Sequence, residues 1–324
     1  MKAVAVCQTE NGSSLELIDI EKPAPSEHQA LVEVKASGLN RTDLRRAQQH
    51  FSNTGTRHIA GLELAGIVVA IGDSVTDLEV GDRVMAMAPN AYAEYALVDA
   101  RTAIKVPEGV DWPEASSIPT WYQTAHNALV GEGGFAAGQS VLITAASSGI
   151  GIASVQIAKL LGAKKIIGTS SSAKKFPALR DIGLDVGIIP SQENLSERVL
   201  AETDGEGVDV VIDMIGGGLL SDLLDATKNG GTIVSVGRMG GFTDEIDLDK
   251  LALKRLRLVG VTFRSLDLNG KRALRDAMLR DLHAALSEGR LKPLVDRTFP
   301  LDQALAAQEY MSENKHFGKV VLIP

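Results

Sequence analysis

The stretch Ser140-Val-Leu-Ile-Thr-Ala-Ala-Ser-Ser-Gly-Ile-Gly151 runs from an apolar strand through a turn of small residues into the start of a helix. Small residues at such a turn let the backbone approach a pyrophosphate, whose charge the helix N-terminus stabilises. The match to the pattern G-x-G-x-x-G is incomplete, because Ser148 replaces one expected glycine and Thr or Ala another. The turn therefore predicts a dinucleotide site, with an ordinary strand-to-helix turn as the alternative. Apolar residues then recur at helical spacing: Ile150, Ala153, Ile157 and Leu161.

The same order of strand, turn and helix repeats from about residue 119 onward. Consecutive parallel strands need a crossover helix between them, so this alternation predicts an α/β fold with a doubly wound parallel sheet. We assign this dinucleotide-binding domain to residues 119–264. The further strands are predicted over Lys165–Thr169, Val208–Asp213, Gly231–Val236 and Leu256–Phe263.

The first part of the chain has a different pattern, with short β-rich runs separated by Gly, Pro and Asp. After Phe263 the sequence predicts a charged helix, an extended run, another helix and a last strand over 318–323. We expect this tail to return to the first domain, which then comprises residues 1–118 and 265–324. The early runs are Leu31–Lys35, Leu64–Ile71, Arg83–Met87 and Tyr92–Val98.

The composition disfavours several classes of partner and site. The 324 residues carry a formal net charge of −8, which repels phosphate backbones and anionic bilayers, so we expect neither nucleic acid nor a membrane as a partner. One cysteine, Cys7, allows no disulfide within the chain and no cysteine-rich metal cluster. The N-terminus turns polar too early for a signal-peptide core, and no apolar run reaches about 18 residues. We therefore predict a cytoplasmic protein.

The end of the second cofactor-domain strand bears on the choice of dinucleotide. Chains that prefer NAD usually have an acidic residue there, which holds the ribose 2′-hydroxyl. Here the sequence is Gly168-Thr-Ser-Ser-Ser-Ala-Lys-Lys175, with hydroxyls and ammonium groups but no carboxylate. Such groups suit a 2′-phosphate, so Ser171, Ser172 and Lys175 are predicted to bind NADPH. The alternative is that Ser172 caps the following helix and that the lysines are solvated.

Further motifs occur in a fixed order along the chain: Gly38–Asp43, Gly61–Gly66, Gly81–Val84, Ala91–Tyr95, Ala145–Gly151 and Asn314–Val321. With them the whole chain resembles the zinc-free quinone oxidoreductase branch of the medium-chain dehydrogenase/reductase superfamily, which includes ζ-crystallin. The resemblance implies a Rossmann cofactor domain plus a β-rich, GroES-like catalytic domain. Ser148 and the Ser-x-x-Lys of Ser172 to Lys175 most resemble the p53-inducible quinone oxidoreductase subgroup.

Zinc alcohol dehydrogenases of the same superfamily differ from this chain at two metal ligands. Their motifs resemble Cys-Arg-Thr-Asp and Gly-His-Glu at the positions where this chain has Asn40-Arg-Thr-Asp43 and Gly61-Leu-Glu63. Zinc needs about four ligands, and neither Cys7 nor the six histidines show metal-ligand spacing. We therefore predict no metal site. Without a Lewis acid to stabilise an alkoxide, alcohol oxidation is disfavoured and reduction of an electrophilic acceptor remains.

The resemblance also implies roles for individual residues. The catalytic candidates are Asn40, Asp43 and Phe51; the alternative for Asp43 is to fix the loop after Asn40 through backbone hydrogen bonds. Two positions depart from the family: Phe51 replaces a tyrosine near the substrate, and Pro190 stands where a tyrosine often lies near the 2′-phosphate. The predicted cofactor-binding residues are Asn40, Thr124, Ser148, Gly149, Ile150, Ser171, Ser172, Lys175, Gly237, Phe263, Arg264, Gly318 and Lys319.

These features predict NADPH-dependent hydride transfer from nicotinamide C4 to a quinone or an activated α,β-unsaturated carbonyl, with a proton from solvent. One alternative is reduction of an enoyl thioester, although no basic cluster suited to a CoA phosphate is evident. Another is a non-catalytic, NADPH-binding structural or regulatory protein like the lens crystallins. Arg255–Phe263 is predicted to be a long edge strand whose unpaired backbone groups a twofold mate would cover, so we predict a homodimer.

Overall fold

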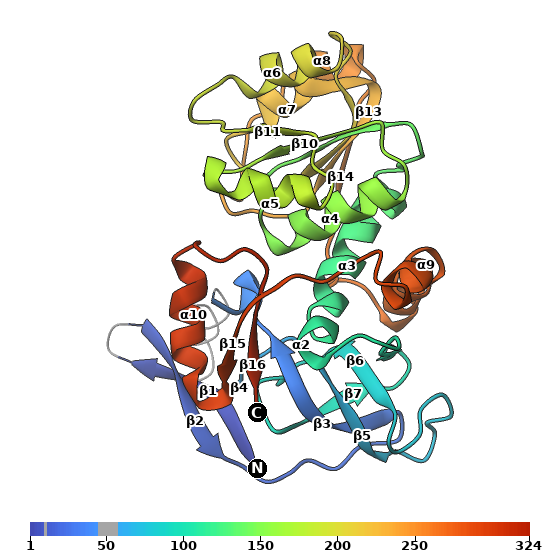
Figure 1. Ribbon diagram of the computed structural model, residues 1–324, viewed down its shortest axis with the longest axis vertical. Coiled ribbons are helices and arrows are strands. Elements are labelled where there is room, and N and C mark those ends of the chain that lie inside the picture. The colour runs from blue at the N-terminus through green and yellow to red at the C-terminus, as the bar shows by residue number, and fades with distance from the viewer. Residues whose placement is uncertain (10–11, 45–57) are drawn as a thin grey trace. The chain divides into compact units, whose positions relative to one another are not determined.

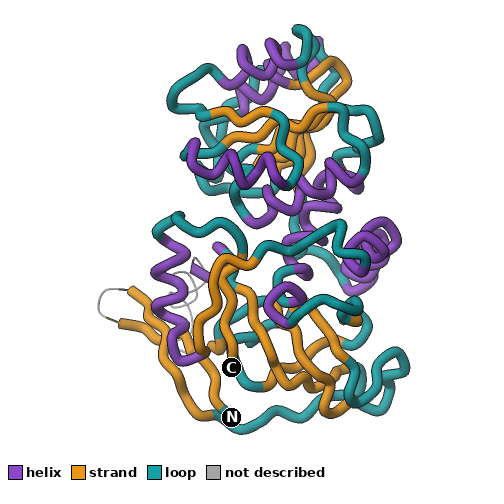
Figure 2. Tube along the Cα trace, in the orientation of Figure 1, coloured by secondary structure: helices purple, strands orange, loops and turns teal. Residues whose placement is uncertain are grey.

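The computed structural model describes residues 1–9, 12–44 and 58–324. The described chain divides into two compact units, one made of Met1–Thr120 and Leu268–Pro324 and the other of Trp121–Asp267. Figure 1 labels elements of both units where there is room, and Figure 2 colours the chain by secondary structure. Within the described ranges no helix is long and apolar enough to cross a membrane. Phe51 lies outside the described residues.

The unit Trp121–Asp267 is built on a parallel sheet whose strands, within the described chain, follow the order β11-β10-β9-β12-β13-β14. The chain moves outward from β9 to one edge and then from β12 to the other, so the sheet is doubly wound as predicted. The strands are β9 Ser140–Ile143, β10 Lys165–Thr169, β11 Val186–Ile188, β12 Val208–Asp213, β13 Thr227–Ser235 and β14 Arg257–Gly260.

Helices cover both faces of this sheet. Figure 1 shows α4 and α5 on one side and α6, α7 and α8 on the other. Strands covered on both faces are apolar along their whole length, and all four residues of β9 are buried. The helical segments are α3 Ile118–His126, η2 Asn127–Glu132, α4 Gly149–Leu160, η3 Ala173–Lys175, α5 Phe176–Asp181, α6 Leu195–Glu202, α7 Leu220–Ala226 and α8 Leu248–Leu253.

The edge strand β14 is shorter than the strand predicted over Arg255–Phe263. Its pairing with β13 runs only from Arg257 to Gly260. Arg255 has a φ of 51°, in the left-handed region, which a strand residue does not adopt. The turn after α8 therefore extends to Arg255, and only the middle of the predicted segment is a strand at the sheet edge.

The other unit is rich in strands, drawn orange in Figure 2. Among the described residues they form a sheet of order β2-β1-β4 and a second of order β15-β16-β3-β5-β6-β8, with β7 paired to β3. The strands are β1 Lys2–Thr9, β2 Gly12–Asp19, β3 Gln29–Gly38, β4 His58–Ile59, β5 Glu63–Ile71, β6 Arg83–Met87, β7 Tyr95–Asp99, β8 Ile104–Lys105, β15 Val295–Pro300 and β16 Lys319–Ile323.

The C-terminal tail belongs to this β-rich unit. Strand β16 pairs antiparallel with β3, with Val321 opposite Gly38. This register brings the start of β16 beside the segment that follows β3. Because β16 is apolar apart from its first residue, Lys319 is carried into a buried position. The helical segments of the unit are α2 Trp112–Ala115, α9 Leu268–Ser287, η4 Leu301–Gln303 and α10 Ala304–Ser312.

Candidate active site

The turn between β9 and α4 has the geometry of an anion-binding helix start. Ser148 is the N-cap of α4, with a φ of −75° and a ψ of 164°, and its Oγ accepts a hydrogen bond from Gly151 N at 3.2 Å. The N–H groups of Gly149 and Ile150 lie in the first turn, where the helix offers no carbonyl partner. These donors and the helix dipole favour a phosphate group. The structure thus brings Ser148, Gly149 and Ile150 together.

Close packing requires two glycines of this turn. A methyl group added at Gly149 would collide with the ring of Trp121, and one added at Gly151 would lie 2.6 Å from the carbonyl oxygen of Ala145. Ala145 itself has a φ of 46°, in the region where glycine is the usual residue. The turn therefore keeps a glycine-type backbone although the sequence lacks two glycines of the pattern.

A buried pair that the sequence analysis did not identify, Thr144 and Asp213, joins the carboxyl ends of β9 and β12. Thr144 Oγ1 donates to Asp213 Oδ1 at 2.9 Å and accepts from Met214 N at 2.7 Å. The carboxylate also accepts from the N–H groups of Ile215 and Gly216. Burial raises the pKa of Asp213, and these hydrogen bonds oppose the shift. Its signal in the sequence is a polar residue at the end of each of two buried strands.

The serines after β10 form a hydrogen-bonded corner beside the turn. Ser170 Oγ lies 3.4 Å from Ser147 Oγ and accepts from Ser172 N at 3.2 Å. Ser172 precedes η3, but among the described residues its side chain makes no capping hydrogen bond. The capping alternative for Ser172 is therefore wrong. Ser171 is exposed and lies just after the carboxyl end of β10, whereas Lys175 is half-buried at the end of η3.

The remaining predicted residues of this unit lie after other strands or in a helix. Gly237 follows β13, and a methyl group there would collide with the carbonyl of Met214. Phe263 and Arg264 follow the end of β14. Thr124 is buried in α3. In open α/β sheets ligands bind at the carboxyl ends of the strands, where all but Thr124 lie. Their contacts with a cofactor stay predictions.

In the β-rich unit, Asn40, Glu63 and Lys319 form a buried polar cluster. Lys319 Nζ donates to Asn40 Oδ1 at 2.9 Å and to Glu63 Oε1, while Asn40 Nδ2 donates to Glu63 Oε1 at 2.8 Å. The side chains of Lys319 and Glu63 are 0% exposed. Asn40 and Lys319 were predicted from the sequence as cofactor-binding residues, whereas Glu63 was not. Its signal in the sequence is a charged residue between Leu62 and Leu64 in an apolar run.

Asp43 anchors the loop that carries Asn40. Its Oδ2 accepts from Asn40 N and from the hydroxyl of Tyr92, each at 2.8 Å. Burial raises the pKa of Asp43 to about 6, and the charge of Lys319 opposes the shift. Burial also raises the pKa of Tyr92. The structure thus shows the loop-fixing contact that was the alternative for Asp43, while its catalytic role stays a prediction.

Gly318 gives the backbone before Lys319 a conformation that residues with a side chain rarely adopt. Its φ is 121°, and a methyl group there would lie 2.8 Å from the carbonyl oxygen of Leu294. That same carbonyl accepts from Lys319 N at 2.7 Å, which fixes the start of β16. The predicted cofactor contact of Gly318 stays a prediction, because conformation alone accounts for the glycine.

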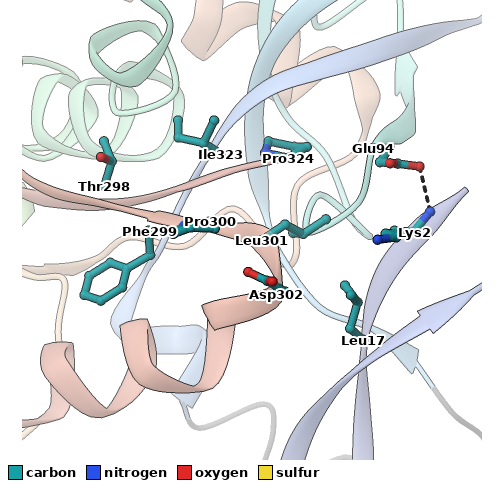
Figure 3. A pocket seen from close by; sticks show the side chains of 10 residues that line it. All are labelled: Lys2, Leu17, Glu94, Thr298, Phe299, Pro300, Leu301, Asp302, Ile323 and Pro324. Carbon is teal, nitrogen blue, oxygen red and sulfur yellow. Dashed lines mark hydrogen bonds between the residues drawn. The ribbon is translucent and has the colours of Figure 1, made fainter.

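A surface cavity of about 500 Å³ lies elsewhere in the β-rich unit and is drawn in Figure 3. At its edge Lys2 N donates to Glu94 Oε2 at 2.7 Å, the dashed line of the figure. No described residue of the predicted site lines this cavity, so the candidate site is defined by the turn and the buried cluster instead. The lining residues are Lys2, Leu17, Glu94, Thr298, Phe299, Pro300, Leu301, Asp302, Ile323 and Pro324.

Metal-ligating side chains are scattered in the described part of the chain. Over residues 1–9, 12–44 and 58–324, no three His, Cys, Asp or Glu side chains are grouped to hold a metal ion. Between Asn40 and Glu63, which belong to the motifs that carry metal ligands in the zinc relatives, lies the ammonium group of Lys319. The absence of a bound metal stays a prediction.

Comparison with known proteins identifies the family. Residues 26–108 match the alcohol dehydrogenase GroES-like domain, and residues 149–280 match the zinc-binding dehydrogenase family. A human quinone oxidoreductase is 30% identical over 328 residues, covering 100% of this chain and 98% of that protein. The solved structure of Escherichia coli quinone oxidoreductase complexed with NADPH superposes with a TM-score of 0.89 at 26% identity, with 100% of both chains covered.

A polyketide synthase of Streptomyces halstedii is 35% identical over 300 residues, which cover 91% of this chain but only 5% of the synthase. The chain therefore spans a small part of that relative, whereas it spans nearly all of the human protein. The motifs at Gly38–Asp43 and Ala145–Gly151, the two-unit fold and the full-length match agree. The chain belongs to the quinone oxidoreductase branch of the medium-chain dehydrogenase/reductase superfamily.

Proposed function

We propose that this protein is an NADPH-dependent, zinc-independent oxidoreductase that reduces quinones or activated α,β-unsaturated carbonyls. The observation that carries the proposal is the Ser148-capped start of α4 beside a corner of serines that contains no carboxylate. Full-length similarity to quinone oxidoreductases, one of them crystallised with NADPH, supports the same function.

The residues at the carboxyl edge of the parallel sheet fit a dinucleotide. First-turn N–H groups at Gly149 and Ile150 suit the diphosphate, and Gly151 lets the start of α4 pack closely against the backbone of Ala145 and Ala146. The hydroxyls of Ser171 and Ser172 and the ammonium of Lys175 suit a 2′-phosphate, since charge-assisted hydrogen bonds to phosphate are strong. Pro190 is exposed after β11 and supplies no phenol to this phosphate.

When bound, NADPH supplies the hydride. The chain's own task is to orient the acceptor and to exclude water. Asn40 offers a carboxamide N–H donor that suits a carbonyl oxygen, on which negative charge develops during reduction. Asp43 holds the backbone of Asn40 in place. The proton is proposed to come from solvent after hydride transfer. Protonation by solvent is easiest when the acceptor is a quinone or an activated enone.

The buried cluster of Asn40, Glu63 and Lys319 disfavours a zinc ion. Asn40 and Leu62 are poor ligands for a borderline-soft metal. A cation placed between Asn40 and Glu63 would also have to displace the fully buried ammonium group of Lys319. Because like charges repel strongly in a buried site, this arrangement disfavours a metal there.

A second candidate, reduction of an enoyl thioester, is supported by a solved enoyl reductase structure that superposes with a TM-score of 0.84 at 26% identity, with 99% of this chain and 98% of that chain covered. Enoyl thioesters are also α,β-unsaturated carbonyls, so the same hydride chemistry would serve them. A third candidate, an NADPH-binding structural or regulatory protein, predicts tight binding without turnover.

A panel of acceptors assayed with NADPH separates these functions. We expect turnover of 1,4-benzoquinone, 9,10-phenanthrenequinone or short enones, at the same rate before and after treatment with a metal chelator. Preferential turnover of crotonyl thioesters would replace this proposal with the second candidate. NADPH binding in a fluorescence titration without turnover of any acceptor would support the third.

The protein is also proposed to be a cytoplasmic homodimer paired through the β14 edge of the parallel sheet. Leu258 in β14 is 42% exposed and Leu253 at the end of α8 is 69% exposed. Exposed apolar side chains along an unpaired strand edge favour pairing with a second copy. We also propose that the chain belongs to the p53-inducible subgroup and that it has no nucleic-acid partner.

A further inference from the structure

The carboxamide of Asn40 is held at both of its polar atoms. Its Oδ1 accepts from Lys319 Nζ at 2.9 Å, and its Nδ2 donates to Glu63 Oε1 at 2.8 Å. Rotating the carboxamide by half a turn would place an NH₂ group against an ammonium and an oxygen against a carboxylate. Both contacts would then be repulsive, so the ion pair selects one of the two orientations.

The ion pair itself is fixed by the surrounding backbone. The second oxygen of Glu63, Oε2, accepts from Thr120 N at 2.9 Å. Gly38 packs against the pair so closely that an added methyl group would lie 2.5 Å from Lys319 Cε and 2.8 Å from Glu63 Oε1. The pair is thus in contact with Gly38 at the end of β3 and with the backbone of Thr120 in α3.

Such a pair is a poor means of stabilising a fold. Removing two charges from water is costly, and replacing a buried ion pair by well-packed apolar residues of similar volume is often neutral or stabilising. The Lys319–Glu63 pair thus calls for a role beyond stability. Burial lowers the pKa of Lys319, and the charge of Glu63 opposes that shift.

We propose that Lys319 is a positioning residue which, paired with Glu63, fixes the orientation of the Asn40 carboxamide so that one N–H of Nδ2 remains for the carbonyl oxygen of the acceptor. This inference rests on the proposed function. It gives Lys319 a task different from the cofactor contact predicted from the sequence. It also defines the substrate class by chemistry: the acceptor presents a hydrogen-bond-accepting oxygen beside the bond that receives hydride.

The count of donors supports this assignment. A carboxamide nitrogen carries two N–H groups, and Glu63 takes one of them. Asn40 is 6% exposed, whereas both charged partners are completely buried, so Asn40 is the most exposed member of the cluster.

The test compares Lys319→Met with the double variant Lys319→Met/Glu63→Gln. The single variant leaves Glu63 buried without its cation, so it is expected to lose stability. The double variant carries no unpaired charge and is expected to recover most of the lost melting temperature. Because neither side of the Asn40 carboxamide is then selected by charge, kcat/KM for the quinone or enone should stay about tenfold below wild type. The Kd for NADPH should change by less than about threefold.

Lys105→Met serves as the matched control, because Lys105 also pairs with a carboxylate, Asp82, but is 60% exposed. Lys105→Met should leave the melting temperature, kcat/KM and the Kd for NADPH unchanged. A double variant that recovers both its melting temperature and its kcat/KM would overturn the positioning role, as would a loss confined to NADPH affinity. Failure of the wild type to reduce any quinone or enone would instead remove the proposed function, whatever the variants do.

If the double variant does not fold, the wild type supplies the measurement through its side-chain amide NMR signals, assigned with Asn40→Asp. The Nδ2 protons of Asn40 should give two well-separated resonances, of which one moves when a quinone is added to the complex with NADP⁺, which has no hydride to transfer. No change on quinone addition would contradict the proposal.

Discussion

The hydroxyl of Tyr92 donates a hydrogen bond of 2.8 Å to Asp43 Oδ2, the same oxygen that accepts the backbone N–H of Asn40. Tyr92 is completely buried and belongs to a different segment of the β-rich unit. Asp43 therefore links the loop of Asn40 to a buried residue of the core. Because both donors converge on one oxygen, an asparagine at position 43 could keep both contacts through its Oδ1.

This relationship predicts how stability depends on pH. Burial raises the pKa of Asp43 from 3.8 to about 6, so the folded state binds this proton more tightly than the unfolded state. Between pH about 4 and about 6 the contribution of Asp43 to the free energy of unfolding falls as the pH rises, by on the order of 3 kcal/mol in total. Asp43→Asn should remove this decline and be at least as stable as wild type at pH 7.5.

The prediction is checked by urea unfolding of wild type and Asp43→Asn at pH values from about 4 to about 8. Parallel curves for the two proteins would show that Asp43 does not titrate in this window. A kcat that falls by about a thousandfold in the variant, with stability retained, would show instead that Asp43 is catalytic.

The preference for NADPH is predicted to depend on Lys175. Lys175→Ala should raise the KM for NADPH about tenfold, because a charge-assisted contact to the 2′-phosphate is lost. The KM for NADH should not change, since NADH lacks that phosphate. Lys164→Ala, which removes an exposed lysine of the same unit, is the control for net charge. An unchanged preference in Lys175→Ala would sink the assignment.

Gly151→Ala is predicted to damage the turn itself. The added methyl group would lie 2.6 Å from Ala145 O and 2.7 Å from Ala146 Cα, and both are backbone atoms. We expect a loss of about 1–3 kcal/mol in the free energy of unfolding, with weaker NADPH binding. Gly241→Ala should be mild, because its methyl group would be 3.4 Å from the nearest atom, and equal effects of the two changes would refute the packing argument.

Dimerisation through β14 is predicted to be sensitive to charge at Leu258. Leu258→Asp should raise the dimer dissociation constant by at least about tenfold, because it places a charge on the proposed apolar edge. Val80→Asp changes a residue that is 63% exposed in the β-rich unit and should have no effect. Sedimentation velocity checks both variants. A wild type that is monomeric at micromolar concentration would remove the proposal.

The parallel sheet was predictable because its evidence is local. Apolar strands alternate with helical periodicity, and this order predicts helices packed on a parallel sheet. The turn at Ser148 could also be predicted from residues adjacent in sequence. The length of β14 could not, because the turn that Arg255 makes depends on its backbone conformation rather than on hydrophobicity.

The buried cluster was only half predictable. Lys319 and Asn40 are separated by 279 positions, and their contact depends on the pairing of β16 with β3. Resemblance to relatives indicated both residues but not their bond. A local signal exists, because Glu63 and Lys319 are charged residues within otherwise apolar strands, which is costly unless they meet a partner. Nothing in the sequence shows that each is the partner of the other.

The protein is proposed to reduce quinones with NADPH, and anaerobic turnover of 9,10-phenanthrenequinone tests this activity most directly. Oxidation of NADPH and loss of the quinone should proceed one for one, at a rate proportional to protein concentration, faster with NADPH than with NADH. The rate should not change after treatment with a metal chelator. A rate no greater than that of the protein-free mixture would contradict the account.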